Sequence, residues 1–452
     1  MNRATTIVTL LLVVLQLQAR AQSPTRTLSL REAITIAVEN NRELKSARME
    51  MDKADHRVRE AIGSALPSIS ASGLYTRALK KQVFFLPEKF INPDAVGDNS
   101  VPMVIGSDNS IQFGINATQI LFNSAVFTGV GASKIYQRAS REMYRASLNA
   151  TVANVKRAFY GVHFTQQVLK LTKASMQNAE DKLKNVRIFF KQGIVSEYDF
   201  IRAEVQTENI RPMVIEAERN VVVATNGLKL LLAIDPKENI SASGELEFEP
   251  LDPAIIESAE QRVLDQNAQL KALGYQTDVN EALISIYRSE MMPTLAAFGN
   301  YMWQAQRNTF DIFNYPFVQT SQVGLSLSFS LFSGMQTSAR IDQAKIDHLK
   351  SEEQLHSARD GMRTNVQSIR LRLETAKKRI DGQARTVEQA EKGYKIATTR
   401  YASGSGTQLE VNDADLALMR ARVNRIQAIF DYAHARIDLE EIMSIEQTAS
   451  TE

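Results

Sequence analysis

The chain contains the stretch Val323-Gly324-Leu325-Ser326-Leu327-Ser328-Phe329-Ser330-Leu331, in which apolar residues alternate with Gly or Ser without exception. Such alternation predicts a β-strand with one apolar face and one polar face. The stretch lies within a segment at about 322–332, and similar segments lie at about 66–78, 110–122 and 293–303. Each is about 10 residues long, the length of a tilted strand that crosses a bilayer. A soluble β-sandwich is the alternative, and with four strands it would be a small one.

Long helices are predicted around these strands. The sequence has no Pro from Asn109 to Arg211 and none after Pro316, so nothing forces a helix to break there. Two helices of about 65 residues are therefore allowed, and each would be about 100 Å long. From Leu355 onward, apolar or small residues recur at a mean spacing of about 3.5 residues, which is the coiled-coil period. Pro212 predicts a kink or break in the helix that follows the first long one.

Each long helix is predicted to end at a glycine phrase, from which the chain returns as a second helix. The phrases are Gly193-Ile194-Val195-Ser196 and Gly404-Ser405-Gly406-Thr407. Gly ends a helix through a left-handed residue, and Ser or Thr caps the next helix. Both Ser196-x-x-Asp199 and Thr407-x-x-Glu410 resemble capping boxes. We therefore interpret the two phrases as the tips of helical hairpins.

The sequence also repeats itself. One phrase occurs twice, as Asn41-Arg42-Glu43-Leu44-Lys45 and as Asn267-Ala268-Gln269-Leu270-Lys271, and the same offset places Leu66-Pro67-Ser68 on Met292-Pro293-Thr294. Self-similarity of this kind indicates two copies of one unit in a pseudo-symmetric protomer. The predicted organisation is a signal peptide at 1–21, repeat 1 at 22–235, a middle segment at 236–264, repeat 2 at 265–437 and a C-terminal tail at 438–452.

Residues 1–21 are typical of a secretory signal peptide. Arg3 supplies the positive end, the run from Ala4 to Leu17 carries no charge, and Ala19-Arg20-Ala21 offers small residues before a cleavage site after Ala21. A membrane-spanning helix is the alternative, but it needs about 20 apolar residues. No later stretch is apolar enough to cross a bilayer as a helix. Any membrane role must therefore use the strands.

Composition excludes several classes of function. The 53 basic and 51 acidic residues leave a net charge of +2, so no basic surface for nucleic acid is expected. The absence of Cys excludes disulfides, thiolate metal sites and a thiol nucleophile. No phosphate-binding glycine loop and no HExxH or GxSxG motif occurs. We expect neither an enzyme nor a cofactor, and no metal site, because the His residues at 56, 163, 348, 356 and 434 lack ligand spacing.

The predicted strands require more than one chain. Four strands cannot close a barrel, and the amide groups of an open edge have no partners in lipid. Two protomers would provide eight strands and a filled interior, whereas three would provide twelve and leave space for water. Ser, Gly, Thr and Asn on the non-lipid faces favour the wider interior. The expected fold is mainly α with membrane β: a long helical shaft and a shared twelve-stranded transmembrane β-barrel, in a homotrimer.

Several phrases resemble the TolC-like outer-membrane efflux protein family, the outer membrane factors. They are Leu28-Ser29-Leu30-Arg31-Glu32-Ala33, the Asn-x-x-Leu-Lys phrase, the paired strand starts and the tip Arg400-Tyr401-x-x-Gly404. The resemblance covers nearly the whole mature chain. It implies a trimeric tunnel in the outer membrane of a diderm bacterium, with a twelve-stranded β-barrel in contact with outer-membrane lipid and a long α-helical coiled-coil barrel in the periplasm. Such a tunnel is the exit duct of a tripartite efflux or type I secretion system, joined to a periplasmic adaptor (membrane fusion) protein and an inner-membrane transporter.

The same resemblance assigns site residues. Asp199 and Tyr401 match an aspartate and a tyrosine that close the periplasmic gate, while the arginine that assists them falls at Gly406. Glu410 and Asp413 match an acidic pore ring that favours cations. Capping explains Asp199 and Glu410 equally well, Tyr401 can end the apolar seam, and Asp413 can be a plain exposed acid. Adaptor docking is expected at the tips, where turn chemistry is the alternative reading: Gly193, Ile194, Val195, Ser196, Gly404, Ser405, Gly406 and Thr407.

Two other functions fit part of the sequence. A periplasmic coiled-coil adaptor or scaffold would share the signal peptide and hairpins, but it has no use for strands of bilayer length. A passive porin would use the strands but not the long helices. The loop at about 77–109 is expected to face outside, as a receptor surface or a lid, and the sequence does not identify the substrate.

Overall fold

The computed structural model describes residues 26–94, 96–97, 99–311, 314 and 316–444. The predicted signal peptide lies outside the described residues. The chain forms two compact units: unit 1 comprises Met1–Asp52, Ala139–Gly274 and Glu353–Glu452, and unit 2 comprises Lys53–Arg138 and Tyr275–Glu352.

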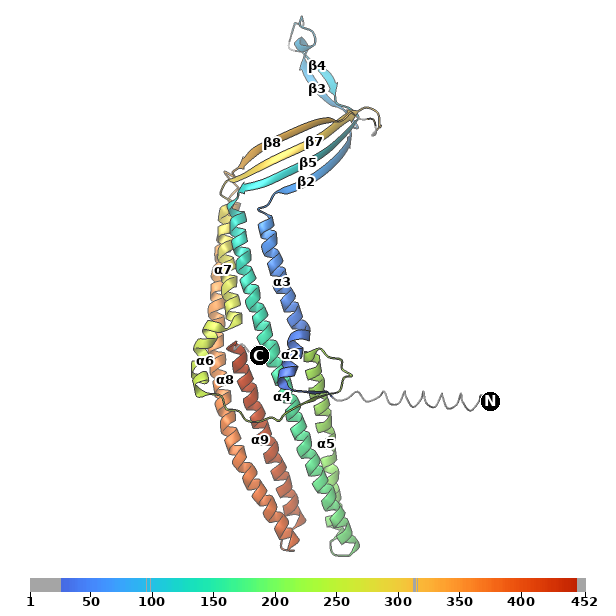
Figure 1. Cartoon of the computed structure of the whole chain (residues 1–452), viewed down its shortest axis with the longest axis vertical. Helices are drawn as coiled ribbons and strands as arrows, with labels where there is room; N and C mark the ends of the chain where they lie inside the picture. Colours follow the sequence, from blue (N-terminus) through green and yellow to red (C-terminus); the bar gives the residue numbers. More distant parts are fainter. Residues whose placement is uncertain (1–25, 95, 98, 312–313, 315, 445–452) are drawn as a thin grey trace, which may run out of the picture. The chain divides into compact units, whose positions relative to one another are not determined.

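Two helical hairpins dominate the described chain (Figure 1). Helix α4 (Ser124–Lys191) has 68 residues and α8 (Gln336–Ala402) has 67, so the prediction of two long helices is confirmed. Helix α5 (Glu197–Leu232) follows α4, and α9 (Gln408–Ile442) follows α8. Among the described helices, none is both long and apolar enough to cross a membrane.

The sequence predicts a kink or break at Pro212, and the break is wrong because α5 is continuous through the proline. Packing next to the proline explains the difference. Ile210 is buried against Met176 and Ala179 of α4, and Ala217 is buried on the other side of the proline. These contacts hold the helix in place although Pro212 cannot donate a backbone hydrogen bond.

Apolar seams join the helices of unit 1. In α8, Val366, Ile369 and Leu373 are buried against α9 and against α6 (Pro253–Gln266). A second core joins α4 and α5 to α2 (Leu30–Asn40). A fully buried large apolar side chain contributes about 1.5–3 kcal/mol, so each seam stabilises its helices strongly.

Two buried asparagines occupy equivalent positions in the repeated phrase. Asn41 lies between α2 and α3 (Arg42–Gly63), and its Nδ2 donates to the Leu231 carbonyl at the end of α5, at 3.0 Å. Its Oδ1 accepts from the Leu44 N–H at 3.1 Å, at the start of α3. The Asn41 side chain therefore forms hydrogen bonds with a carbonyl at the end of α5 and with an N–H at the start of α3.

Asn267 makes the same two bonds in the second half of the chain. It lies between α6 and α7 (Ala268–Ser289), and its Nδ2 donates to the Ile442 carbonyl at 2.8 Å. Its Oδ1 accepts from the Leu270 N–H at 3.0 Å. The shared bonding gives a physical reason for the repeated Asn-x-x-Leu.

Replacement Asn267→Asp should lower the free energy of unfolding by about 2 kcal/mol. Asp keeps an acceptor for the Leu270 N–H but loses the donor, which leaves the part-buried Ile442 carbonyl beside a carboxylate. Urea unfolding followed by circular dichroism in detergent would measure the change. The control is Asn185→Asp, at an exposed position of α4. Equal stability of both variants would contradict this role of the amide.

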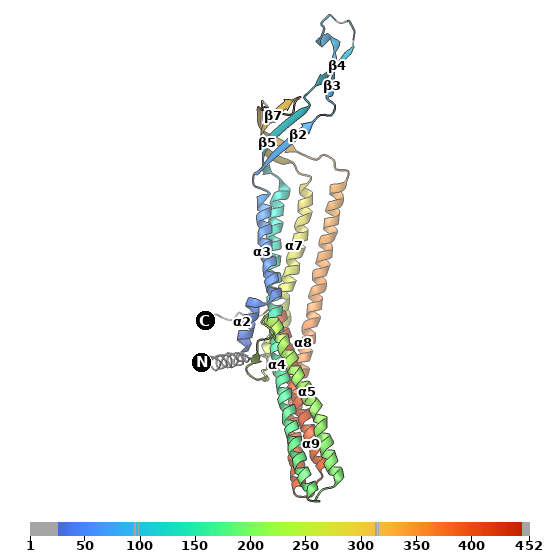
Figure 2. The same ribbon diagram turned by 90° about the vertical axis from the view of Figure 1, so that its right-hand side faces the viewer.

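A four-stranded antiparallel sheet lies in unit 2, in the order β2-β5-β7-β8 (Figure 1), and Figure 2 shows β2, β5 and β7 from another side. The strands are β2 (Ser68–Arg77), β5 (Asn109–Phe122), β7 (Thr294–Arg307) and β8 (Val318–Ser328). Strand β7 extends past the predicted alternation because its last residues pair with the start of β5, as in Gln304 with Gln112. Within the described sheet, β2 and β8 have one neighbour each and form its edges.

The registers of the sheet separate apolar from polar residues. One row across the four strands, on the apolar face, is Ile69, Ala117, Gly299 and Val323. The next row, on the opposite face, is Ser70, Asn116, Asn300 and Gln322. The sheet therefore has one face suited to lipid and one suited to water.

Two small sheets were not predicted. Strands β1 (Arg26–Leu28) and β6 (Ile240–Ala242) pair in parallel. Strands β3 (Gln82–Pro87) and β4 (Ser100–Ile105) form an antiparallel ribbon within the loop at about 77–109. In the ribbon Phe85 is 68% exposed, so an aromatic side chain lies on its surface.

Candidate functional site: the helical tips and the contact between the hairpins

The first tip is a glycine turn followed by a complete capping box. Gly193 has a φ of 72°, and the Ile194 N–H donates to the Phe189 carbonyl at 2.9 Å, as in a Schellman motif. The Asp199 N–H donates to Ser196 Oγ at 3.2 Å. In return, Asp199 Oδ2 accepts from Ser196 Oγ at 2.6 Å and from the Ser196 N–H at 3.4 Å. The predicted capping box at this tip is confirmed.

The second tip has the same turn but only half of a capping box. Gly404 has a φ of 75°, and the Ser405 N–H donates to the Arg400 carbonyl at 2.9 Å. The Glu410 N–H donates to Thr407 Oγ1 at 3.3 Å. The Glu410 carboxylate instead lies near Arg400, with Oε2 3.7 Å from Nη1. The second predicted capping box is therefore wrong in its reciprocal bond, because a guanidinium group attracts the carboxylate.

Position 406, where the resemblance expects an arginine, is closely surrounded. A Cβ atom on Gly406 would lie 3.0 Å from Arg400 Cβ, 3.0 Å from Glu410 Oε2 and 3.1 Å from the Tyr401 nitrogen. Arg400 also donates from Nη2 to the Ser405 carbonyl at 3.1 Å. The second tip therefore has a cation, and its bonds lie within that tip.

Asp199 and Tyr401 lie within electrostatic reach of each other, although they belong to different hairpins. Burial raises the pKa of Tyr401, and the negative charge of Asp199 raises it further. The phenol therefore stays protonated at neutral pH and can donate a hydrogen bond. The Asp199 carboxylate is bonded to Ser196 in this conformation. The gate assignment for this pair stays a prediction.

The other predicted site residues line the tips. Glu410 and Asp413 are exposed, and their spacing places them on one face of α9. Ile194 is 66% exposed, whereas Val195 is half-buried, so Ile194 is the larger apolar surface of the two. Gly406 is also half-buried, and the remaining tip positions are exposed: Gly193, Ser196, Gly404, Ser405 and Thr407. Their roles in docking and in an acidic ring stay predictions.

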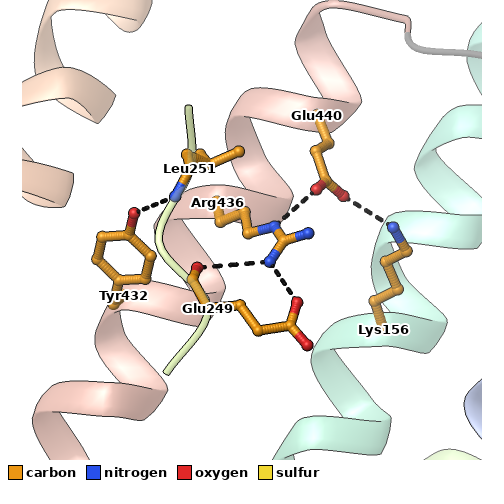
Figure 3. Close-up of polar contacts among 6 residues, drawn as sticks. All are labelled: Lys156, Glu249, Leu251, Tyr432, Arg436 and Glu440. Carbon is orange, nitrogen blue, oxygen red and sulfur yellow. Dashed lines mark hydrogen bonds and ion pairs between the residues drawn. The ribbon is translucent and has the colours of Figure 1, made fainter. Parts of the chain in front are cut away.

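A network of charges joins α4 to the end of α9 (Figure 3). Lys156 Nζ lies 2.8 Å from Glu440 Oε2, and Arg436 Nε donates to Glu440 Oε1 at 2.9 Å. Arg436 Nη1 also lies 2.8 Å from Glu249 Oε2. Burial favours protonation of Glu440, but Lys156 and Arg436 outweigh it and lower the pKa of this carboxyl group.

Arg157 extends the network on the same two helices. Its Nη2 lies 2.7 Å from Asp438 Oδ1 and also contacts Glu441. We call the whole set the clamp: Lys156, Arg157, Arg436, Asp438, Glu440 and Glu441. The sequence analysis missed it. The available signal was the basic pair Lys156-Arg157 and the acidic block Asp438-Leu439-Glu440-Glu441, on helices that also carry apolar seams.

Comparison with known families identifies the chain. Residues 33–233 and 260–444 match the family described as Outer membrane efflux protein. The chain belongs to that family. Each matched segment of this outer membrane efflux protein contains two strands of the four-stranded sheet and one hairpin with its tip. The TolC-like resemblance is confirmed. The family comprises transport channels and not enzymes.

Individual relatives support the assignment. The outer membrane protein TolC of Vibrio cholerae serotype O1 is 21% identical over 341 residues, which cover 73% of this chain and 75% of TolC. The alkaline protease secretion protein AprF of Pseudomonas aeruginosa is 22% identical over 324 residues, which cover 71% of this chain and 67% of AprF. The crystal structure of the Campylobacter jejuni CmeC outer membrane channel matches with a TM-score of 0.74 and 19% identity, covering 92% of this chain and 85% of that channel. This last likeness concerns the fold.

Proposed function

We propose that this outer membrane efflux protein is the exit duct of a tripartite efflux or type I secretion system. The observation that carries the proposal is the sheet β2-β5-β7-β8, which has an apolar face and two edges without neighbours in the described chain. Unpaired edges cannot lie in lipid, so neighbouring chains must complete the sheet. Three copies give twelve strands, enough for a water-filled barrel lined by rows such as Ser70, Asn116, Asn300 and Gln322.

The proposed barrel spans the outer membrane, and the helices lie in the periplasm. Tyr301 and Trp303 support this placement, since their rings lie 4.5 Å apart in a strand with an apolar face, as in the aromatic girdle of membrane barrels. The equivalent bonds of Asn41 and Asn267 support two internal repeats. The paired tips then close the periplasmic end, with Asp199 and Tyr401 as the gate and Glu410 and Asp413 as the acidic ring.

The tips are the proposed docking site for a periplasmic adaptor, which links the duct to an inner-membrane transporter. Exposed Ile194 supports docking at the first tip. The names of the relatives cover both kinds of system: AprF is a protease secretion protein, and TtgC of Pseudomonas putida is a toluene efflux pump outer membrane protein.

The test is the assembly state of the mature protein and its conductance. We expect extraction from the outer-membrane fraction only with detergent, a native mass of three chains, and low resting conductance in planar bilayers. A water-soluble monomer would reject the proposal. Large conductance at rest would favour a passive porin.

A further inference from the structure

Helices α4 and α9 contribute several of the contacts between the two hairpins. The contacts form a series that starts at the clamp and continues toward the tips. Phe164 of α4 and Phe430 of α9 stack with ring centroids 4.8 Å apart. Further along, Lys182 Nζ lies 3.5 Å from Asp415 Oδ2. The number of ionic contacts between these two helices therefore falls from the clamp to the tips.

Lys182 contacts both helices of the second hairpin. Besides Asp415 of α9, its Nζ lies 5.3 Å from the ring centroid of Tyr394 in α8, a cation–π geometry. The side chains of Lys182 and Asp415 are 21% and 16% exposed, so water screens their attraction less than that of a surface pair. Tyr394 itself packs against Val387 and Leu418. The ammonium group therefore lies between an anion of α9 and a packed ring of α8.

The surroundings of the pair come from both hairpins and are partly polar. Lys182 and Asp415 line a small cavity together with polar residues of both hairpins, and three apolar residues of the first hairpin complete the lining: Gln206, Thr207, Gln408 and Asn412, with Ala179, Ala203 and Ile210. The polar part of the wall allows water to enter once the helices separate. Compared with a sealed apolar contact, this junction can therefore open without leaving buried polar groups unpaired.

We propose that Lys182 and Asp415 form a latch that holds the second hairpin against the first, and that the clamp is the pivot about which the hairpins separate. The proposal rests on the proposed function as a gated duct. Lys182 lies 25 positions after Arg157, or about 37 Å along α4, and the end of α4 lies about 51 Å from the clamp. A rotation that parts the tips by about 10 Å would part the helices by about 7 Å at Lys182 and by about 2 Å at Phe164. Opening then breaks the latch but leaves the aromatic contact.

The test uses Lys182→Met, which keeps the apolar stem, and Asp415→Asn, which keeps the shape. Each should raise the open probability of the reconstituted channel about fivefold, because the closed state loses its ionic contact. The exchanged pair, Lys182→Asp with Asp415→Lys, should restore open probability to within about twofold of the parent. The control is Lys173→Gln, since Lys173 pairs with Glu218 at 2.7 Å within the first hairpin. It should leave gating unchanged.

The melting temperature of each variant shows whether the trimer stays intact, and this separates an effect on gating from a merely structural role. A latch requires that open probability rises while the trimer stays intact, and that the exchanged pair reverses the rise. Unchanged open probability in both single variants would overturn the latch, and so would an equal rise in Lys173→Gln. The proposed function would survive either result as long as the parent protein is a trimer with low resting conductance. Loss of those two properties would instead reject the proposed function.

Discussion

Combined replacement Asp199→Ala and Tyr401→Phe should shift the resting channel strongly toward the open state. The phenol of Tyr401 is protonated and lies within electrostatic reach of the Asp199 charge, and the two changes together remove the polar groups proposed to join the hairpins. Loss of about 2 kcal/mol from the closed state corresponds to about a thirtyfold change in the open-to-closed ratio. Single-channel recording of the purified protein in planar bilayers would measure this ratio.

The control for this experiment is Ser196→Ala, because Asp199 also caps α5. Loss of the cap weakens the start of the helix by about 1 kcal/mol but leaves the carboxylate and the phenol in place. We therefore expect little change in conductance. If Ser196→Ala opens the channel as much as the double variant does, Asp199 acts through the cap and not through Tyr401. Unchanged conductance in the double variant would reject the gate assignment.

Replacement Glu440→Gln should lower the free energy of unfolding by about 3 kcal/mol. Glutamine keeps the shape of Glu440 but removes the anion that contacts the largely buried Lys156, and it leaves Arg436 with Glu249 alone as its anion. Urea unfolding of the helical signal in detergent would measure the loss. The control is Glu374→Gln, because Glu374 pairs with Lys378 on the exposed surface of α8 at 2.7 Å. It should be indistinguishable from the parent, and equal losses would contradict the role of the clamp.

The clamp also predicts how stability depends on pH. The folded state lowers the pKa of Glu440 below its ordinary value of 4.5. A lowered carboxyl pKa contributes stability that is complete above the unfolded value and disappears as the pH falls through the folded value. The difference between the parent and Glu440→Gln should therefore be constant from neutral pH to about 5.5 and shrink in stronger acid.

Periodicity explains why the long elements could be predicted from the sequence. The alternation in Val323–Leu331 and the apolar spacing along α8 are local patterns that show which side chains share one face, although β8 begins earlier, at Val318, and ends at Ser328. The glycine turns at Gly193 and Gly404 were predictable for the same reason, because a left-handed residue is required there. Strands β1 and β6 were missed because three residues are too few to show alternation.

Contacts between helices were harder to predict. The partners Lys182 and Asp415, or Lys156 and Glu440, are set by how α4 and α9 align, and one sequence carries no direct signal of that alignment. The second capping box failed because Arg400 competes for Glu410, a contact across the turn that spacing alone does not reveal. Long-range ion pairs therefore become visible only once the helices are placed side by side.

The open edges of the sheet bear on how the protein is made. In the proposed duct, a newly exported protomer exposes one unpaired edge of β2 and one of β8, together with the apolar face of the sheet. Such edges are templates for aggregation in water. We therefore expect the chain to need a periplasmic chaperone between export and insertion. When the chain is overproduced, we expect aggregates to form faster than assembled channels do. We therefore expect the rate of assembly to limit how much functional channel accumulates.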